Sequence, residues 1–231
     1  MEVKEKYTGC TISPHKCRCF EMLSDEEKTL LEAKSVVVKY KKGEMICKQG
    51  SFASHVMYMQ KGLAKVFIDD GTNTLVIKII PDCNLLGLSS LSDENHKFQY
   101  SAMAYVDSEV KQIDIHFFKQ LLIRNSVFAR EIIDVMGENN TQINSRFFCL
   151  MHKQSYGRLA DILLCMADRI FRKGEFILPL SRKDLAELSG MSSETVIRML
   201  KKFHDEGLIE LTGKNFRIID YQRLKRISET G

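Results

Sequence analysis

The segment from Ser181 to Gly207 does most to limit what this chain can fold into. It predicts two short helices joined by a turn at Gly190, because glycine tolerates the sharp backbone conformation that such a turn needs. The second helix has an apolar stripe and a separate polar face, each with a spacing of i, i+3, i+4 and i+7. The apolar stripe is Val196, Met199, Leu200 and Phe203, and the other face is Glu194, Ile197, Arg198 and Lys201. This pattern is typical of a helix-turn-helix, whose second helix lies in the DNA major groove.

Capping residues support both helices. Ser181 and Asp184 have the spacing of a capping box, and Ser192 or Ser193 can cap the second helix. Gly207 ends that helix. The local sequence therefore predicts the helix pair independently of its apolar pattern.

The chemistry of the polar face suits base recognition. Arg198 can donate two hydrogen bonds to a guanine edge, and Glu194 can accept one from a cytosine amine. Ile197 is an apolar residue on a face that should be wet, and contact with a thymine methyl would explain it. The alternative is an ordinary i, i+4 ion pair between Glu194 and Arg198 on a solvated helix.

A predicted β-hairpin follows the helix pair. Two β-rich runs flank the turn residues 212–215, which favours a winged helix. Lys214 and Arg217 would then lie near the phosphate backbone.

The segment 181–209 resembles the DNA-binding signature of the CRP/FNR transcription regulators. The matching motifs are Arg-Lys-Asp-Leu-Ala at 182–186, Gly-Met-Ser-Ser-Glu-Thr-Val-Ile-Arg at 190–198 and Glu-Gly-Leu-Ile at 206–209. The resemblance continues upstream through Gly157-Arg-Leu-Ala-Asp-Ile-Leu-Leu and most of the chain. It implies that Glu194 and Arg198 read bases, whereas Ser193 stands where the family often has a polar or basic reader. The expected DNA-contacting residues are Ser181, Arg182, Ser192, Ser193, Glu194, Thr195, Ile197, Arg198, Lys201 and Lys214.

Residues 36–115 have the pattern of short strands separated by turns. The runs 36–40, 56–59, 63–68, 75–80 and 101–106 are rich in β-branched and apolar residues. Their spacing predicts an antiparallel sandwich or barrel. The resemblance implies a β-roll that serves as the effector domain, so the expected fold class is α+β.

A long helix is predicted from about Asn125 to Lys153. Its residues repeat at three and four, which is coiled-coil-like spacing, although the middle is polar. An ordinary helix packed on the roll is the alternative, but the resemblance implies a dimer helix and thus a homodimer on a palindromic operator. The predicted interface is Phe128, Ile132, Val135, Asn139, Ile143 and Leu150. The expected domains are 1–124 for the roll, 125–153 for the dimer helix and 154–231 for the winged helix-turn-helix.

The resemblance also locates an effector pocket, with expected residues Leu86, Gly87, Leu88, Tyr100 and Ser101. Relatives that respond to cyclic nucleotides hold the ligand with a Gly-Glu pair and a later Arg-Ser or Arg-Thr pair. Here Leu88 replaces the Glu and Tyr100 replaces the Arg, and a buried phosphate without a cation is very costly. Cyclic AMP or GMP is therefore not the expected effector, although an atypical cyclic-nucleotide pocket remains an alternative. A more apolar ligand is another.

The N-terminal cysteines suggest a different signal. An odd count of seven cysteines favours reduced thiols over a disulfide framework. Cys10, Cys17 and Cys19 cluster with His15, so they are candidate ligands of a metal or an iron–sulfur cluster, or members of a thiol switch; the alternative is that they are structural cysteines without such a role. Their spacing departs from that of the oxygen-sensing FNR proteins, and Lys111 stands where those proteins have a cysteine in the roll. Haem is a further alternative, but no spacing singles out one of the six histidines.

Charge and motif content narrow the function classes. The net charge of +4 lies in residues 152–231, which suits a phosphate-binding module. No apolar run is long enough to cross a membrane, and the N-terminus lacks a signal core, so we expect a cytoplasmic protein with no membrane partner. The sequence lacks the phosphate-cradling, zinc-hydrolase and serine-hydrolase motifs, so we do not expect an enzyme. The expected partners are double-stranded DNA and RNA polymerase; a helix pair that binds protein instead is the remaining alternative.

Overall fold

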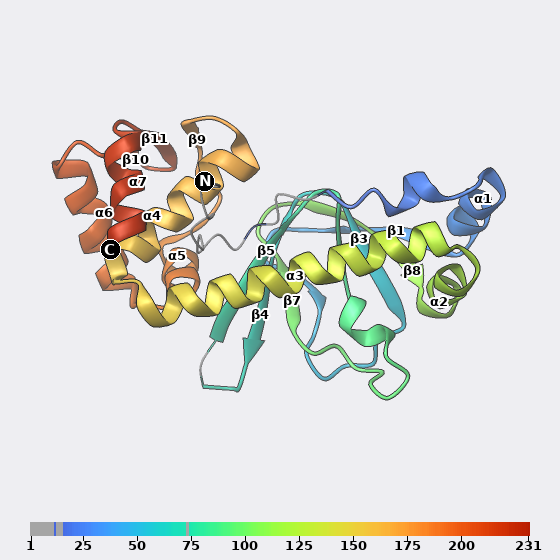
Figure 1. Cartoon of the computed structure of the whole chain (residues 1–231). Coiled ribbons are helices and arrows are strands. Elements are labelled where there is room, and N and C mark those ends of the chain that lie inside the picture. The colour runs from blue at the N-terminus through green and yellow to red at the C-terminus, as the bar shows by residue number, and fades with distance from the viewer. Residues whose placement is uncertain (1–11, 13–15, 73) are drawn as a thin grey trace, which may run out of the picture. The chain divides into compact units, whose positions relative to one another are not determined.

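The computed structural model describes residue 12 and residues 16–72 and 74–231. It is an α+β structure that divides into two compact units (Figure 1). One unit contains residues 16–74 and 79–140, and the other contains residues 141–231, with Leu75–Lys78 grouped with it.

The first unit is an antiparallel β-roll, as predicted. Its strands form two four-stranded sheets, with the orders β1-β8-β3-β6 and β2-β7-β4-β5. Predicted runs coincide with five of these strands, whereas β2, β6 and β8 were not predicted. The strands are β1 (Ser35–Tyr40), β2 (Met45–Cys47), β3 (His55–Lys61), β4 (Leu63–Asp69), β5 (Thr74–Pro81), β6 (Asn84–Leu86), β7 (Ser101–Ala104) and β8 (Ser108–Asp114).

The turn from β3 to β4 depends on Gly62. Its φ of 125° lies in the region that favours glycine. A Cβ there would lie only 2.2 Å from the Ser108 Oγ at the start of β8. Glycine therefore allows this turn to pack directly against the neighbouring strand.

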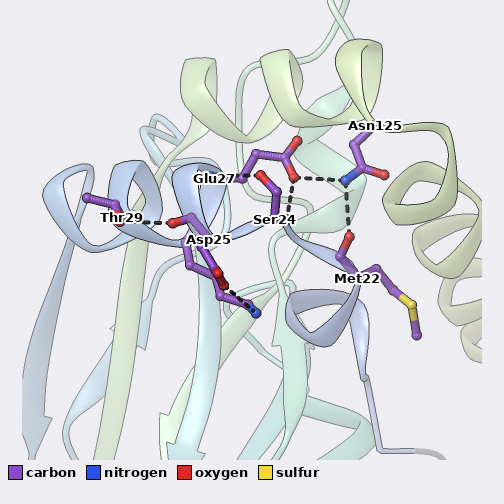
Figure 2. A network of polar contacts seen from close by, with 7 residues as sticks. Met22, Ser24, Asp25, Glu27, Thr29 and Asn125 are labelled. Atoms are coloured by element: carbon purple, nitrogen blue, oxygen red, sulfur yellow. Dashed lines mark hydrogen bonds and ion pairs between the residues drawn. The ribbon is translucent and has the colours of Figure 1, made fainter.

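A polar network joins α1 (Asp25–Ala33) and α2 (Ile115–Arg124) to the N-terminal end of α3 (Ser126–His152), a helix whose residues up to 140 belong to this unit. Ser24 and Glu27 form a capping box at the start of α1. The Asn125 amide nitrogen donates to the Met22 carbonyl at 3.2 Å and to Glu27 at 3.0 Å (Figure 2). The Asn125 amide oxygen accepts from the Phe128 backbone N–H at 2.9 Å. One side chain thus caps α3 and binds the start of α1.

One face of α3 packs on its own unit. Phe128, Ile132 and Val135 are 0%, 2% and 7% exposed because they belong to the core of that unit. These three residues of the predicted dimer interface face inward within the chain, as the alternative of a helix packed on the roll expects. Asn139 and Leu150 are partly buried, and only Ile143 of the predicted set is exposed.

The second unit is a winged helix-turn-helix, as predicted. A three-stranded sheet with the order β10-β11-β9 accompanies the helices, and its core includes the stacked rings of Phe171 and Phe176. The elements are α4 (Ser155–Cys165), a π-helical turn (Met166–Phe171), β9 (Glu175–Ile177), α5 (Arg182–Ser189), α6 (Ser193–Asp205), β10 (Ile209–Thr212), β11 (Asn215–Ile218) and α7 (Tyr221–Thr230). No described helix is long and apolar enough to span a bilayer.

Candidate nucleic-acid interface

Helix α6 presents the two faces that its sequence predicts. Val196, Met199, Leu200 and Phe203 are all buried. On the other face Glu194, Arg198 and Lys201 are exposed, and Ile197 leaves 53% of its surface in solvent. The apolar stripe anchors the helix, so the polar face is available to a large ligand.

Caps fix the ends of both helices. The Ser181 Oγ accepts the Asp184 N–H at 3.1 Å, and Asp184 accepts the Ser181 N–H at 2.8 Å. At α6 the cap is Ser192 rather than Ser193, since the Ser192 Oγ accepts the Thr195 N–H at 3.2 Å. The Ser181 cap fixes the start of α5, and the Ser192 cap holds the N-terminal turn of α6, the part that enters the groove in a helix-turn-helix.

Glu194 and Arg198 of α6 do not form an ion pair with each other. Among the described residues Arg198 forms no ion pair, so the proposed pair with Glu194 is absent. Glu194 instead accepts hydrogen bonds from its own backbone N–H and from Ser192, and these hold the pKa of its carboxyl below the usual value. Glu194 is thus an ionised acceptor and Arg198 is a free donor, which matches their expected roles in base recognition.

Two arginines position the turn between α5 and α6. The Arg158 Nε donates to the Ser189 carbonyl at 2.8 Å, and the buried Arg146 donates to the Leu188 carbonyl. Burial lowers the pKa of Arg146 to about 10. At the adjacent Gly190 the φ of 62° suits glycine, and a Cβ would lie 3.2 Å from Leu150. The motif containing Arg158 was visible in the sequence, but its contact with α5 was not.

The wing carries its own positive charge. Lys214 is exposed in the turn between β10 and β11, where Gly213 adopts a φ of 63°. Arg217 is also exposed and lies 4.0 Å from Glu210 across the hairpin. Of the remaining predicted contacts, Ser181 and Ser192 are exposed, whereas Arg182, Ser193 and Thr195 are partly buried.

In the roll, the predicted effector residues do lie together. The Gly87 N–H donates to the Tyr100 Oη at 2.7 Å, and the Ser101 Oγ accepts the Gln49 N–H at 3.0 Å. Leu86 and Leu88 are buried. Burial raises the pKa of Tyr100, so its phenol stays neutral. Tyr100 therefore binds the Gly87 backbone itself and brings no positive charge to this turn.

The described residues contain no group of three or more His, Cys, Asp or Glu side chains arranged to hold a metal ion. Cys17 and Cys19 are buried beside each other, and Cys10 lies outside the described residues. A hydrogen bond from Cys19 holds the pKa of Cys17 below the usual value, and burial raises the pKa of Cys19. Cys165 is disulfide-bonded, which corrects the expectation of reduced thiols throughout.

Comparison with known proteins agrees with both units. Residues 37–125 match the cyclic nucleotide-binding domain family, and residues 157–227 match the Crp-like helix-turn-helix domain family. The transcriptional activator protein FnrA of Stutzerimonas stutzeri is 27% identical over 185 residues, which cover 78% of this chain and 75% of FnrA. Electron transport regulator A of Shewanella oneidensis is 24% identical over 96% of this chain and 92% of its own.

Solved structures show the same fold. FixK2 from Bradyrhizobium japonicum superposes with a TM-score of 0.77 at 21% identity, covering 85% of this chain and 98% of that one. The capped recognition helix, the wing, the roll and these matches lead to one conclusion. The chain belongs to the CRP/FNR family of DNA-binding transcription regulators.

Proposed function

We propose that the protein is a homodimeric regulator that binds a palindromic operator and responds to a signal other than a cyclic nucleotide. The observation that carries the proposal is the exposed, unpaired Arg198 on a helix whose opposite face is fully packed. Arg198 and Glu194 read bases, Ile197 contacts a thymine methyl, and Lys201 and Lys214 bind phosphate. RNA polymerase is a proposed partner, which the activator name of the relative FnrA supports.

A different face of α3 supports dimer formation. Ile143, Phe147 and Met151 are 43%, 67% and 67% exposed. They recur every four residues along α3 and therefore lie on one face of the helix. Large apolar side chains in such a row mark an interaction surface. We propose that this row, the exposed stripe of α3, replaces Phe128, Ile132 and Val135 as the dimer contact.

The chemistry of the roll argues against a cyclic nucleotide. A buried phosphate needs a cationic partner, and Leu88 and Tyr100 occupy the positions expected for the carboxylate and the guanidinium. Tyr100 already satisfies the Gly87 N–H that would otherwise face a ligand. We retain the division into a sensor to residue 124, a helix from 125 to 153 and a DNA-binding part from 154 as a proposal.

The proposal is tested by selecting binding sites from a random duplex library with the full-length protein. We expect a palindrome whose half-sites lie about one helical turn, roughly 34 Å, apart. Cyclic AMP or GMP should leave the affinity for that site unchanged. Enrichment of no sequence, or of a single half-site bound by a monomer, would contradict the proposal.

A further inference from the structure

Two neighbouring cysteines, Cys17 and Cys19, meet the distant Cys83 in the roll unit; the three are here called the thiol cluster. The Cys17 backbone N–H donates to the Cys83 carbonyl at 2.8 Å, and the Cys17 and Cys19 side chains are hydrogen-bonded. The Cys83 side chain is hydrogen-bonded to the Tyr58 hydroxyl. All three are free thiols. The function assigned above uses none of them.

The backbone contact brings Cys17 and Cys83 within the range of α-carbon separations that disulfides span. With the Cys17 N–H bonded to the Cys83 carbonyl, covalent geometry limits the separation of their α-carbons to about 6.7 Å. Disulfides span about 4.4–6.8 Å between α-carbons. Cys83 is partly exposed, whereas Cys17 and Cys19 are buried, so a solute reaches Cys83 first.

The backbone at Cys83 is a second, independent observation. Its φ of 60° lies in the left-handed region, which costs a residue other than glycine roughly 1–3 kcal/mol. Its N–H is fixed by the Met59 carbonyl at 2.8 Å, and its neighbour Asp82 pairs with Lys16 at 3.4 Å. The turn is thus held in an uncommon conformation directly against the segment that contains Cys17.

We propose that Cys17 and Cys83 form a reversible disulfide in response to peroxide, and that this disulfide regulates DNA binding. The Cys83 sulfur attacks one peroxide oxygen, so that the S–O bond forms, the O–O bond breaks and the second oxygen leaves as water with the thiol proton. The Cys17 sulfur then attacks the Cys83 sulfur, and the S–O hydroxyl leaves as a second water with the Cys17 proton. The two thiols lose two electrons and two protons, and the peroxide is reduced to two waters.

The segment that contains Cys17 also packs on α3. The Arg18 backbone N–H donates to Glu131 of α3 at 3.2 Å, and the Phe20 and Phe128 rings lie 6.3 Å apart. Cys17 and Cys19 belong to the same core cluster as Phe128. A disulfide would bind this segment covalently to the β5–β6 turn and so change how it supports α3. The regulatory step rests on the proposed function, because α3 leads to the DNA-binding part of the chain.

The disulfide is tested by tryptic mass spectrometry of the reduced full-length protein after exposure to hydrogen peroxide. Lys16 and Arg18 flank Cys17, so trypsin separates Cys17 from Cys19 and the linked residues are identified directly. We expect a peptide pair that joins Cys17 to Cys83, reversed by dithiothreitol and absent in Cys83→Ser. A Cys17–Cys19 bond, no disulfide at millimolar peroxide, or zinc or iron bound stoichiometrically by these thiols would overturn the proposal.

Operator affinity before and after peroxide tests the regulatory step. We expect at least a threefold change that is lost in Cys17→Ser and Cys83→Ser and kept in Cys47→Ser, whose thiol is buried in β2. An equal change in Cys83→Ser, or a disulfide with unchanged affinity, would overturn this step. If the reduced parent selects no operator, the proposed function fails instead, while the disulfide is still judged by mass spectrometry.

Discussion

Truncation of Phe147 should break the proposed dimer without unfolding the chain. Phe147 leaves 67% of its surface exposed on α3, so it contributes little to the core of its own chain. A Phe side chain that becomes covered removes at least about 150 Å² from water. The exposed part of Phe147 therefore offers roughly 100 Å² to a partner, which corresponds to about 2.5 kcal/mol.

The symmetry of a two-fold dimer doubles this effect if each Phe147 is covered independently. Phe147→Ala should then weaken association by about 2.5–5 kcal/mol, depending on whether the two rings share one contact. This corresponds to a dissociation constant raised roughly 60- to 4,000-fold. Sedimentation velocity over a dilution series measures the constant, and far-ultraviolet circular dichroism checks that the helices are retained.

Ile123→Ala is the matched control, because Ile123 in α2 is 84% exposed and lies off the exposed stripe of α3. It should leave the dimer unchanged. Equal dimerisation of Phe147→Ala and the parent, or equal weakening by Ile123→Ala, would refute the assignment of this face.

Three further sets of substitutions test contacts within each unit. Asn125→Ala should lower the free energy of unfolding of the roll unit in urea by about 1–2 kcal/mol, because the Phe128 N–H loses its acceptor. Asn125→Asp keeps this acceptor and should be less destabilising; equal destabilisation by the two variants would argue against the cap. Gly62→Ala should lower the melting temperature more than Gly71→Ala, because both glycines have positive φ but only Gly62 faces Ser108, and equal shifts would contradict this packing. Arg158→Met should speed hydrogen exchange at residues 188–191 and weaken DNA binding, since the Ser189 carbonyl loses its donor; unchanged exchange would remove Arg158 from its positioning role.

The helix pair was predictable because its signals are local. The apolar stripe of α6 and the caps at Ser181 and Ser192 depend on residues within one or two helical turns of each other. The structure confirms the stripe, and it shows Ser192 rather than Ser193 as the cap. Helices whose ends are marked by local capping residues can be predicted without knowledge of their tertiary contacts.

The face of α3 was not predictable in the same way. Two rows of apolar residues run along this helix, one through Phe128 and Ile132 and the other through Ile143 and Phe147. Both satisfy helical spacing, so periodicity cannot say which row packs on the chain's own core. Tertiary contacts select the row through Phe128, since the ring centroids of Phe128 and Phe118 of α2 lie 5.3 Å apart.

Contacts between residues distant in the sequence explain the other features that were not predicted. The strands β2 and β6 have three residues each, too few for an alternating pattern to stand out. The thiol cluster depends on a backbone hydrogen bond between Cys17 and Cys83, which no spacing in the sequence reveals. The contacts of Arg146 and Arg158 with the end of α5 are tertiary in the same sense.

The most direct test of base recognition is the operator affinity of Arg198→Ala on the selected site and on sites with one base pair changed. The parent should discriminate against the change at the base pair that Arg198 is proposed to read by about 1–3 kcal/mol per half-site, and Arg198→Ala should lose that discrimination at this position alone. Lys214→Ala, which removes a proposed phosphate contact, should weaken binding to all sites about equally. Discrimination by Arg198→Ala equal to that of the parent at every position would contradict the account.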